Sequence, residues 1–329
     1  EMEERDPHYA SVLATRKRAI SGVAPTVTPA SERARDREIA EAVEAQIARH
    51  DEFPNLVEDL LDGLGKGFAV VEIDWQTSAR LWAPRHFHWV DPRFIRWDRD
   101  TLSVPHLLTQ AQPADGEPLA PFKFLVHRPR LKSGIALRGG LARVAAFGWM
   151  CKAFALKDWV AFAETYGLPL RLGRYGPEAT REDVEQLFRA VANIGTDAAA
   201  VLPRSMEIEF QSAAAGAGGD QLFENLARYL DEQVSKAVLG QTMTADNGSS
   251  LGQAKIHNEV RHDIAQADAR AVSVTLMRDL VRPFVDLNFG VQQAGYPRLA
   301  IEVTEADDVT ARMTAAASLI GRGLRVRAS

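Results

Sequence analysis

The sequence predicts an α+β fold in which two long helices enclose a compact α/β insert. Residues 141–166 keep helical spacing over about seven turns. Residues 168–211 follow as strand, helix and strand, and residues 220–240 return to helical spacing. If the insert forms a cap, the two long helices run antiparallel below it as a two-helix stalk.

Composition limits the classes of protein to which this chain can belong. With 329 residues, 46% hydrophobic and 25% charged, it can bury a substantial core in two or three structural units. Its single cysteine, Cys151, excludes a disulfide framework and fits a reducing compartment. The net charge of −5 argues against a protein that holds DNA on a large basic face. No apolar run reaches the roughly 18 residues that a membrane span needs.

The N-terminal part, residues 1–138, is expected to contain helices and then strands. Asp6 and Pro7 give the first helix an N-cap and a favourable first turn. Two further helices are predicted in "SERARDREIAEAVEAQIARH" and "PNLVEDLLDGL". Strands of a mixed sheet are predicted in "GFAVVEIDW", in "ARLWAPRHFHWVDPRFIRWD" and in "FKFLVH", with a loop over residues 102–122.

The insert begins with "PLRLGRY", a strand-like segment. A helix is predicted next, with Thr180 as N-cap, Asp183 three residues on and Gly195 as its stop. The segments "AAAVLP" and "MEIEF" complete the unit. A glycine-rich connector then leads to the second long helix. Its apolar side chains recur every fourth residue at Leu222, Leu226, Leu230, Val234 and Val238.

A loop of small, hydroxylated and glycine residues, 241–252, separates this helix from another long one. A turn between antiparallel helices needs only about two to eight residues, so roughly a dozen indicates a function for the loop. The following helix, 253–290, is predicted to be roughly 45 Å long and to be kinked or to end near Pro283. Its apolar face is predicted at Ile256, Val260, Ile264, Ala267, Ala271, Val274 and Val281. Such a face needs neighbours to cover it.

Several stretches have a chemical interpretation and a plainer one, and the plainer one is favoured each time. "GLGKG" at 63–67 lacks the spacing and the strand-to-helix order of a phosphate loop, which favours a helix end. His257 and His262 are five apart, whereas a zincin pair is four apart, so exposed histidines are favoured. "RHFHWVDPRFIRWDRD" could stack single-stranded bases, but its aspartates favour a sheet face. Cys151 has no partner base and is expected to be a packed thiol.

The chain resembles the portal proteins of Mu-like tailed bacteriophages and prophages. The resemblance lies in "KAFALKDWVAFAETYGLPLRLGRYG", in "AAAVLPRSMEIEFQ", and in "LARYLDEQVSKAVLGQTMT" continuing to "DARAVSVTLMRDLVRPFVDLNFG". It covers most of the chain. It implies a ring, typically of twelve subunits, at one capsid vertex of the virion, assembled in the host bacterial cytoplasm. A terminase motor would drive double-stranded DNA through the ring, and capsid and head–tail connector proteins would bind it.

The resemblance also assigns parts to the chain, with neither cofactor nor metal. Residues 1–138 would form the N-terminal helices and a strand-rich wing. Residues 139–167 would be the first stem helix, 168–211 an α/β clip and 212–240 the connector and second stem helix. Residues 241–252 would be the tunnel loop, 253–290 a long wing helix, and 291–329 the return to the wing and the start of a crown. Family members usually carry more chain after the long helix than is present here.

Candidate site residues fall in three of these parts. The tunnel loop would place Gln241, Thr242, Met243, Thr244, Asp246, Asn247, Ser249 and Ser250 towards DNA. In the stem, Arg143, Lys152 and Lys157 would contact DNA or, equally, acidic residues of the neighbouring subunit. In the clip, Arg181, Glu182, Glu185 and Arg189 would form a mixed-charge docking surface for the motor.

Charge along the sequence is consistent with a conduit. Residues 220–290 hold seven Lys/Arg against ten Asp/Glu, a net of −3, whereas residues 139–176 hold five against two, a net of +3. An acidic wall would resist adhesion to phosphate, and each fixed phosphate contact would hinder passage. Two rival hypotheses are a DNA-processing enzyme, either nuclease or NTPase, and a monomeric helical adaptor. The enzyme would need a carboxylate cluster or a phosphate loop, and neither stands out.

Overall fold

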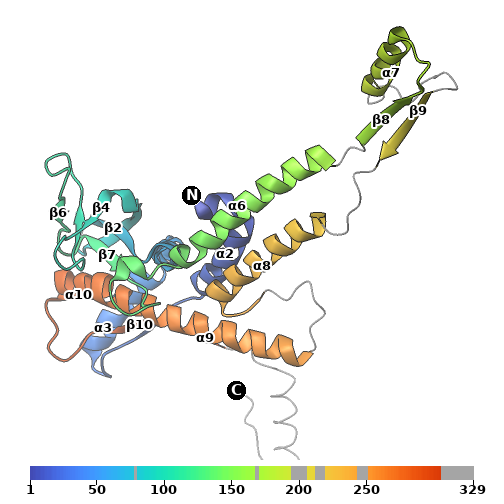
Figure 1. The fold of residues 1–329 in the computed structure, drawn as a ribbon. Helices are drawn as coiled ribbons and strands as arrows, with labels where there is room; N and C mark the ends of the chain where they lie inside the picture. Colours follow the sequence, from blue (N-terminus) through green and yellow to red (C-terminus); the bar gives the residue numbers. More distant parts are fainter. Residues whose placement is uncertain (78–79, 167–169, 194–205, 212–218, 243–250, 305–329) are drawn as a thin grey trace, which may run out of the picture. The chain divides into compact units, whose positions relative to one another are not determined.

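The computed structural model describes residues 1–77, 80–166, 170–193, 206–211, 219–242 and 251–304 (Figure 1). The described residues divide into two compact units. Unit 1 comprises Glu1–Ala146 and the chain from Val234 onward, and unit 2 comprises Phe147–Gln233. Within the described residues, none of the helices is long and apolar enough to cross a bilayer. The two units are considered in turn.

Unit 1 begins with helices whose ends follow their sequence signals. Their bounds are α1 Met2–Arg5, α2 Pro7–Ser21, α3 Ala34–Val43 continuing as the π-helical η1 Glu44–Ala48, α4 Phe53–Leu61 and α5 Gly63–Lys66. The Asp6 carboxylate accepts a hydrogen bond from Tyr9 N at 2.9 Å, which confirms the predicted N-cap. Gly67 has φ +95° and its N–H donates to Gly63 O at 2.7 Å. "GLGKG" therefore ends a helix, as expected.

Two small sheets follow, and both differ from the mixed sheet that was expected. Their strands are β2 Ala69–Gln76, β3 Ala83–Val90 and β7 Phe124–His127 in one sheet, and β4 Ile95–Trp97, β5 Pro105–Leu107 and β6 Glu117–Pro118 in the other. All of these pairs are antiparallel. The predicted loop over 102–122 was also wrong, because it contains β5 and β6. These strands are two or three residues long and contain proline, so local pattern alone indicates a turn.

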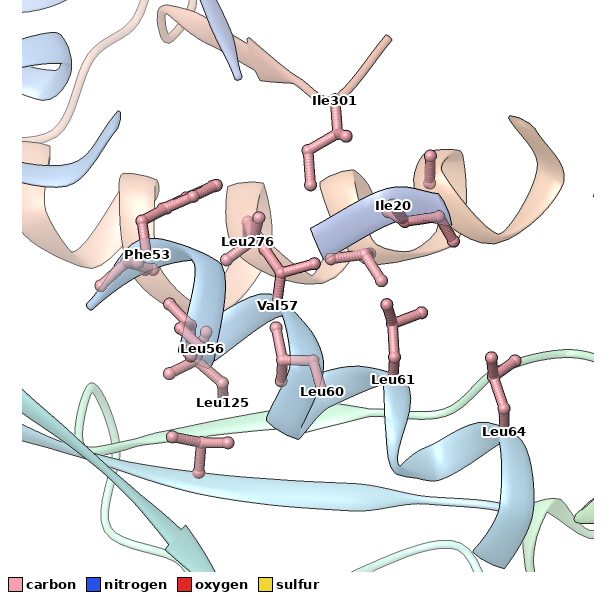
Figure 2. Close-up of a cluster of buried hydrophobic side chains, with 14 of the residues drawn as sticks. Ile20, Phe53, Leu56, Val57, Leu60, Leu61, Leu64, Leu125, Leu276 and Ile301 are labelled. Carbon is pink, nitrogen blue, oxygen red and sulfur yellow. The ribbon is translucent and has the colours of Figure 1, made fainter. Parts of the chain in front are cut away.

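Helix α4 lies at the centre of the core of unit 1 (Figure 2). Leu56 and Leu60 are fully buried, as is Leu125 on β7 of the sheet below them. On the other side of α4 lies Leu276, near the end of the long helix α9 Leu251–Leu276. Full burial of a side chain of this size stabilises the fold by about 1.5–3 kcal/mol. The strongly one-sided apolar pattern of α4 therefore joins the sheet to the long helix.

The long helix continues past α9 as the π-helical η5 Met277–Val281 and then α10 Arg282–Phe289. It begins two residues earlier than predicted, does not end at Pro283, and stops at Gly290, where φ is +77°. The π turn Met277–Val281 lies just before Pro283. Proline lacks an N–H, and the wider turn changes the pattern of backbone hydrogen bonds at this point of the helix.

The predicted apolar face of this helix was wrong in part. Ile256 lies among residues whose side chains are not described, Val274 is 63% exposed and Ala267 is exposed. The buried face instead contains Ala265, Asp268, Ala269, Val272, Thr275, Leu276 and Leu280. This face was not predicted because it includes the polar residues Asp268 and Thr275, so its apolar residues do not recur at regular helical spacing. From Ala265 onward the chain itself covers the helix, so this part needs no neighbouring subunit.

The π turn also completes the edge of the β3-β2-β7 sheet. Asp279 accepts a hydrogen bond from Val126 N at 2.9 Å, and Arg278 donates to Val126 O at 2.6 Å. Both backbone groups of an edge residue are thereby satisfied by side chains. After α10 the chain forms β10 Arg298–Ala300, which pairs antiparallel with β1 Thr26–Thr28.

In unit 2, residues 147–166 of α6 Leu141–Tyr166 run antiparallel to residues 219–233 of α8 Gly219–Leu239. The bounds of α6 agree with the predicted 141–166. Lys152 Nζ lies 2.6 Å from Asp231 Oδ1, and the rings of Phe162 and Phe223 are 5.9 Å apart. The later residue on α6, Phe162, contacts the earlier residue on α8, Phe223. The two helices are therefore antiparallel, as the sequence predicted.

The insert contains β8 Leu170–Tyr175, α7 Arg181–Asn193 and β9 Met206–Gln211, with the two strands paired antiparallel. Thr180 N donates to Asp183 Oδ2 at 2.9 Å and Asp183 N donates to Thr180 Oγ1 at 3.3 Å, which is the predicted capping box. Helix α7 packs closely over Gly173, where a Cβ would lie 3.0 Å from Leu187 Cγ. The predicted stop at Gly195 and the segment "AAAVLP" lie outside the described residues.

Several charged side chains of α2, α4 and their neighbours lie close together in unit 1. Lys17 Nζ, which is nearly buried, lies 2.9 Å from Glu3 Oε1 and 3.5 Å from Asp62 Oδ1. Burial, reinforced by the negative charge of Asp62, raises the pKa of Asp59 to about 6. The charged form of Asp59 is therefore disfavoured in the folded protein.

Replacing Asp59 by asparagine is expected to stabilise the protein above pH 6 and not at pH 4. The folded pKa lies above the ordinary value of 3.8, so the stability linked to this proton is complete at low pH and is lost as pH rises from about 4 to about 6. Because Asp59 is partly exposed, solvent screening reduces the effect, and we expect a gain of about 1 kcal/mol at pH 7.5. Urea unfolding at both pH values measures it. Glu41→Gln, on the exposed face of α3, controls for the change in net charge, and an equal gain at pH 4 would contradict the assignment.

Candidate functional site

The end of α8 and the start of the predicted loop form a closely packed site in unit 1. Helix α8 ends at Leu239, and Gly240 turns the chain with φ +71°. A Cβ at Gly240 would lie 3.2 Å from both Val260 Cγ1 and Ile264 Cδ1 on α9. Glycine is required here because the backbone is left-handed and also packs closely against the next helix.

Arg16 on α2 fixes this end of α8 to α9. Its Nη1 donates to Val238 O at 2.6 Å, while Nε and Nη2 donate to the two carboxylate oxygens of Asp268 at 2.6 and 3.0 Å. The Arg16 and Asp268 side chains are only 8% and 7% exposed. A planar guanidinium suits this arrangement, since it makes a bidentate ion pair and still has a donor for a helix C-terminal carbonyl.

A second contact supports the same helix end. His8 Nε2 lies 2.7 Å from Ser235 Oγ, and Ser235 is 1% exposed. The role of Arg16 was not predicted, because an arginine in "ATRKRAI" resembles a solvated basic face. Asp268 did carry a signal: it lies between Ala265 and Ala269 at helical spacing, where an isolated acid on a small-residue face indicates a buried partner.

The predicted tunnel loop is described only at its first two residues. Gln241 and Thr242 are half-buried, and Gln241 Oε1 is buried without a hydrogen-bond donor among the described residues. The other candidates, Met243, Thr244, Asp246, Asn247, Ser249 and Ser250, lie outside the described residues. Helix α9 begins at Leu251, so the loop is two residues shorter than the predicted 241–252.

The three basic candidates of α6 have different environments. Lys152 is 12% exposed and pairs with Asp231 of the same chain, which is neither of the two predicted partners, DNA and a neighbouring subunit. Arg143 and Lys157 are exposed, and among the described residues neither has a carboxylate partner. Lys152 therefore stabilises the α6–α8 pair, and the other two side chains face solvent in a single chain.

The same helices expose large apolar side chains. On α6 these are Phe147 (71%), Met150 (45%), Phe154 (60%), Leu156 (41%) and Val160 (60%), and on α8 they are Leu222 (65%), Leu226 (42%) and Tyr229 (57%). Leu222 and Leu226 belong to the predicted apolar stripe of α8, whereas Val234 and Val238 on that stripe are buried. Clustered apolar exposure of this kind marks an interaction surface.

On α7, the charged candidates pair with one another. Glu185 lies 3.7 Å from Arg181 and 3.8 Å from Arg189, both one helical turn away, and Glu182 is exposed. The sequence analysis missed Phe188 on the same helix, which is 73% exposed. The surface is therefore a mixed-charge helix with an exposed aromatic residue.

Within the described part of the chain, His, Cys, Asp and Glu side chains do not gather in groups of three or more that could hold a metal ion. Cys151 is half-buried on α6. His262 lies on α9, and the side chain of His257 is not described.

Comparison with known proteins places this chain among viral proteins. It matches the family described as "Portal protein of Mu bacteriophage" over residues 1–329. It is 33% identical to the Mu-like prophage FluMu protein gp29 of Haemophilus influenzae, with 99% of this chain covered. It is 31% identical to the portal protein of Escherichia phage Mu, with 100% of this chain covered. The chain spans 64% of the length of each of these two relatives.

A solved structure from the neck of a native GTA particle, computed with C12 symmetry, has a similar fold. The TM-score is 0.60 at 11% identity, and the match covers 98% of this chain and 88% of that chain. At this level of identity the likeness concerns the fold alone.

Proposed function

Because the chain belongs to the family of portal proteins of Mu bacteriophage, we propose that it forms a closed ring, of twelve subunits, at one capsid vertex of the virion. The ring is the conduit for double-stranded DNA during packaging and ejection. It assembles in the host bacterial cytoplasm, and the terminase motor and head–tail connector proteins dock on it. The neck structures with a similar fold were computed with C12 or C6 symmetry, which supports a ring and is compatible with twelve subunits.

The observation that carries the proposal is the apolar surface of the α6–α8 pair. Phe147 and Phe154 are 71% and 60% exposed in the single chain, although each would gain about 1.5–3 kcal/mol from full burial. A neighbouring subunit packed against them supplies that burial. In a monomeric adaptor, a different protein would have to cover these side chains.

The positions of these residues around α6 support a ring. At about 100° per residue, Phe147, Met150 and Phe154 lie on one side of the buried face of the helix, and Leu156 and Val160 lie on the other side. A ring needs two different interaction faces on each subunit, one for each neighbour. The α6–α8 pair, as the stem, provides them.

The loop after Gly240 is the part that lines the channel. It has eight residues outside the described structure, 243–250, and apart from Met243 these are small or polar. Hydroxyl and amide groups make water-mediated contacts with DNA without a fixed ion pair. The clamp of Arg16 and Asp268 holds the start of the loop, so that DNA can press on it without unwinding α8.

The clip, residues 168–211, docks the motor through α7. Glu185 is already paired with Arg181 and Arg189 within the helix, so its charge adds little to affinity. Glu182 and Phe188 remain exposed. We assign the main contact to Phe188, with the charged residues around it setting the orientation of the partner.

Deleting Ala245 to Ser250 is expected to leave the ring intact and to lower the amount of DNA packaged into capsids or retained there. The ring persists because the deleted residues are not part of the stem surface. Packaged DNA is measured in particles made with the altered chain. The control replaces the same six residues with an equally long run of glycine and serine, and it should package normally. Full DNA-filled capsids from the deletion would show that the loop is only a connector.

A further inference from the structure

A groove in unit 1 lies along the face of the long helix that is turned away from the core. It encloses about 1360 Å³ between α9, η5, the start of α10 and the strand β10 with the residues after it. Four arginines line it: Arg270, Arg278, Arg282 and Arg298. This is an unusual concentration of positive charge for a chain whose net charge is −5.

Three of the four arginines are available for a ligand. Arg278 is occupied by Asp279, at 2.6 Å, and by Val126 O. Arg270 donates only to the neutral side chain of Gln266, and Arg282 lies over the ring of Tyr296, 5.5 Å from its centroid. Among the residues that the structure describes, Arg270, Arg282 and Arg298 have no carboxylate partner. Among the lining residues, Glu302 is the one with an acidic side chain.

The groove is apolar as well as basic. Val274, which is 63% exposed, and Met277 line it on the helix side, and Val303 also lines it. Hydrated phosphate groups of DNA gain nothing from apolar walls, whereas a peptide that carries both carboxylates and small apolar side chains is complementary to them. The chemistry therefore favours an acidic peptide segment over nucleic acid.

The chain itself carries such a segment where it leaves the groove. Thr304 is the last described residue and lines the groove. The sequence continues as "EADDV", with carboxylates at Glu305, Asp307 and Asp308 and apolar side chains between and after them. From Thr304, four residues reach roughly 14 Å when extended, which is enough to bring Asp308 to arginines of the groove.

We propose that this groove binds the acidic segment 305–308 of the same chain, through Arg270, Arg282 and Arg298. Three carboxylates then neutralise three guanidinium groups that would otherwise lie side by side. The contact fixes the direction in which the chain continues beyond the groove. It concerns unit 1 alone and does not depend on the proposed ring.

Hydrogen–deuterium exchange of the backbone amides 305–310, measured on the full-length chain, tests this proposal. Arg270→Glu combined with Arg298→Glu is expected to raise their exchange rate roughly tenfold or more, because charge-assisted contacts are replaced by repulsion. Adding Asp307→Arg and Asp308→Arg to that variant should restore protection. Unchanged exchange of the 265–276 amides establishes that the groove itself remains folded.

The matched control is Arg99→Glu, an exposed arginine of unit 1 that pairs with Asp115 outside the groove. It should leave exchange at 305–310 unchanged. Equal exchange in the wild type and the groove variant would overturn the proposal. So would a loss of affinity for a DNA duplex in the groove variant with no change at 305–310, which would assign the groove to phosphate. Co-assembly of the groove variant with an isotopically labelled wild-type chain shows which chain supplies the bound segment. Faster exchange of the 305–310 amides in the labelled chain would mean that its segment binds the groove of a neighbouring chain, which would contradict the proposal.

Discussion

Replacing Phe147 and Phe154 together by glutamate is expected to abolish ring assembly and to leave each chain folded. The two side chains are 71% and 60% exposed in the single chain, so the change removes little of its own core. Between subunits it removes roughly 3–6 kcal/mol of apolar burial per interface and adds two charges that would have to be desolvated. A loss of that size weakens association by roughly a hundredfold to ten-thousandfold or more per interface.

The measurement is the mass distribution in solution by light scattering, together with the thermal unfolding midpoint. The double change of the same two residues to leucine is the matched control, since it preserves apolar character and should preserve assembly. Assembly that is unaffected by the two glutamates would show that subunits do not contact one another through this side of α6.

Replacing Arg16 by methionine is expected to destabilise unit 1 by about 3–5 kcal/mol, because Asp268 is left buried and charged without a partner. Val238 O also loses its donor. Restoring an apolar match by adding Asp268→Leu should recover most of the stability, since replacing a buried ion pair by packed apolar side chains is often neutral. Urea unfolding of the single and double variants, combined as a double-mutant cycle, measures the coupling.

A different readout separates a positioning role from simple stabilisation. If Arg16 holds the end of α8, hydrogen exchange at residues 236–240 should remain faster in the double variant even where its stability is regained. Similar exchange at 236–240 in the double variant and the wild type would mean that Arg16 contributes stability only.

The helix ends were predicted correctly where the residues that cap them are close in sequence. The Asp6 cap, the Thr180–Asp183 capping box and the end of the helix at Gly67 each depend on residues within one turn, and each is confirmed. The bounds of α6 were also predicted, because 26 residues that contain no proline keep helical spacing and end before Gly167 and Pro169.

The predictions that were wrong concern residues whose contact partners are distant in sequence. Strands β5 and β6 exist because they pair with β4 and with each other, not because their residues alternate. The buried face of α9 was misplaced because Asp268 is buried by an arginine 252 residues away. Lys152 was expected to face DNA or a neighbour, and its partner on α8 became visible only when the two helices were brought together.

The candidate sites likewise include features that the sequence predicted and features that depend on the folded structure. The sequence correctly indicated that α7 carries a mixed-charge surface, but single-residue exposure was needed to identify Phe188. The concentration of arginines in the groove beside β10 could not be predicted, because Arg298 reaches α9 and α10 only through the pairing of β10 with β1.

The mass of the assembly formed by the unaltered full-length chain tests the central claim most directly. A ring of twelve copies of the 36.2 kDa chain has a mass of roughly 430 kDa. Light scattering in line with size-exclusion chromatography, at a salt concentration typical of the capsid interior, should give one closed species near that value. A strictly monomeric species near 36.2 kDa over a wide range of protein concentration would contradict the account.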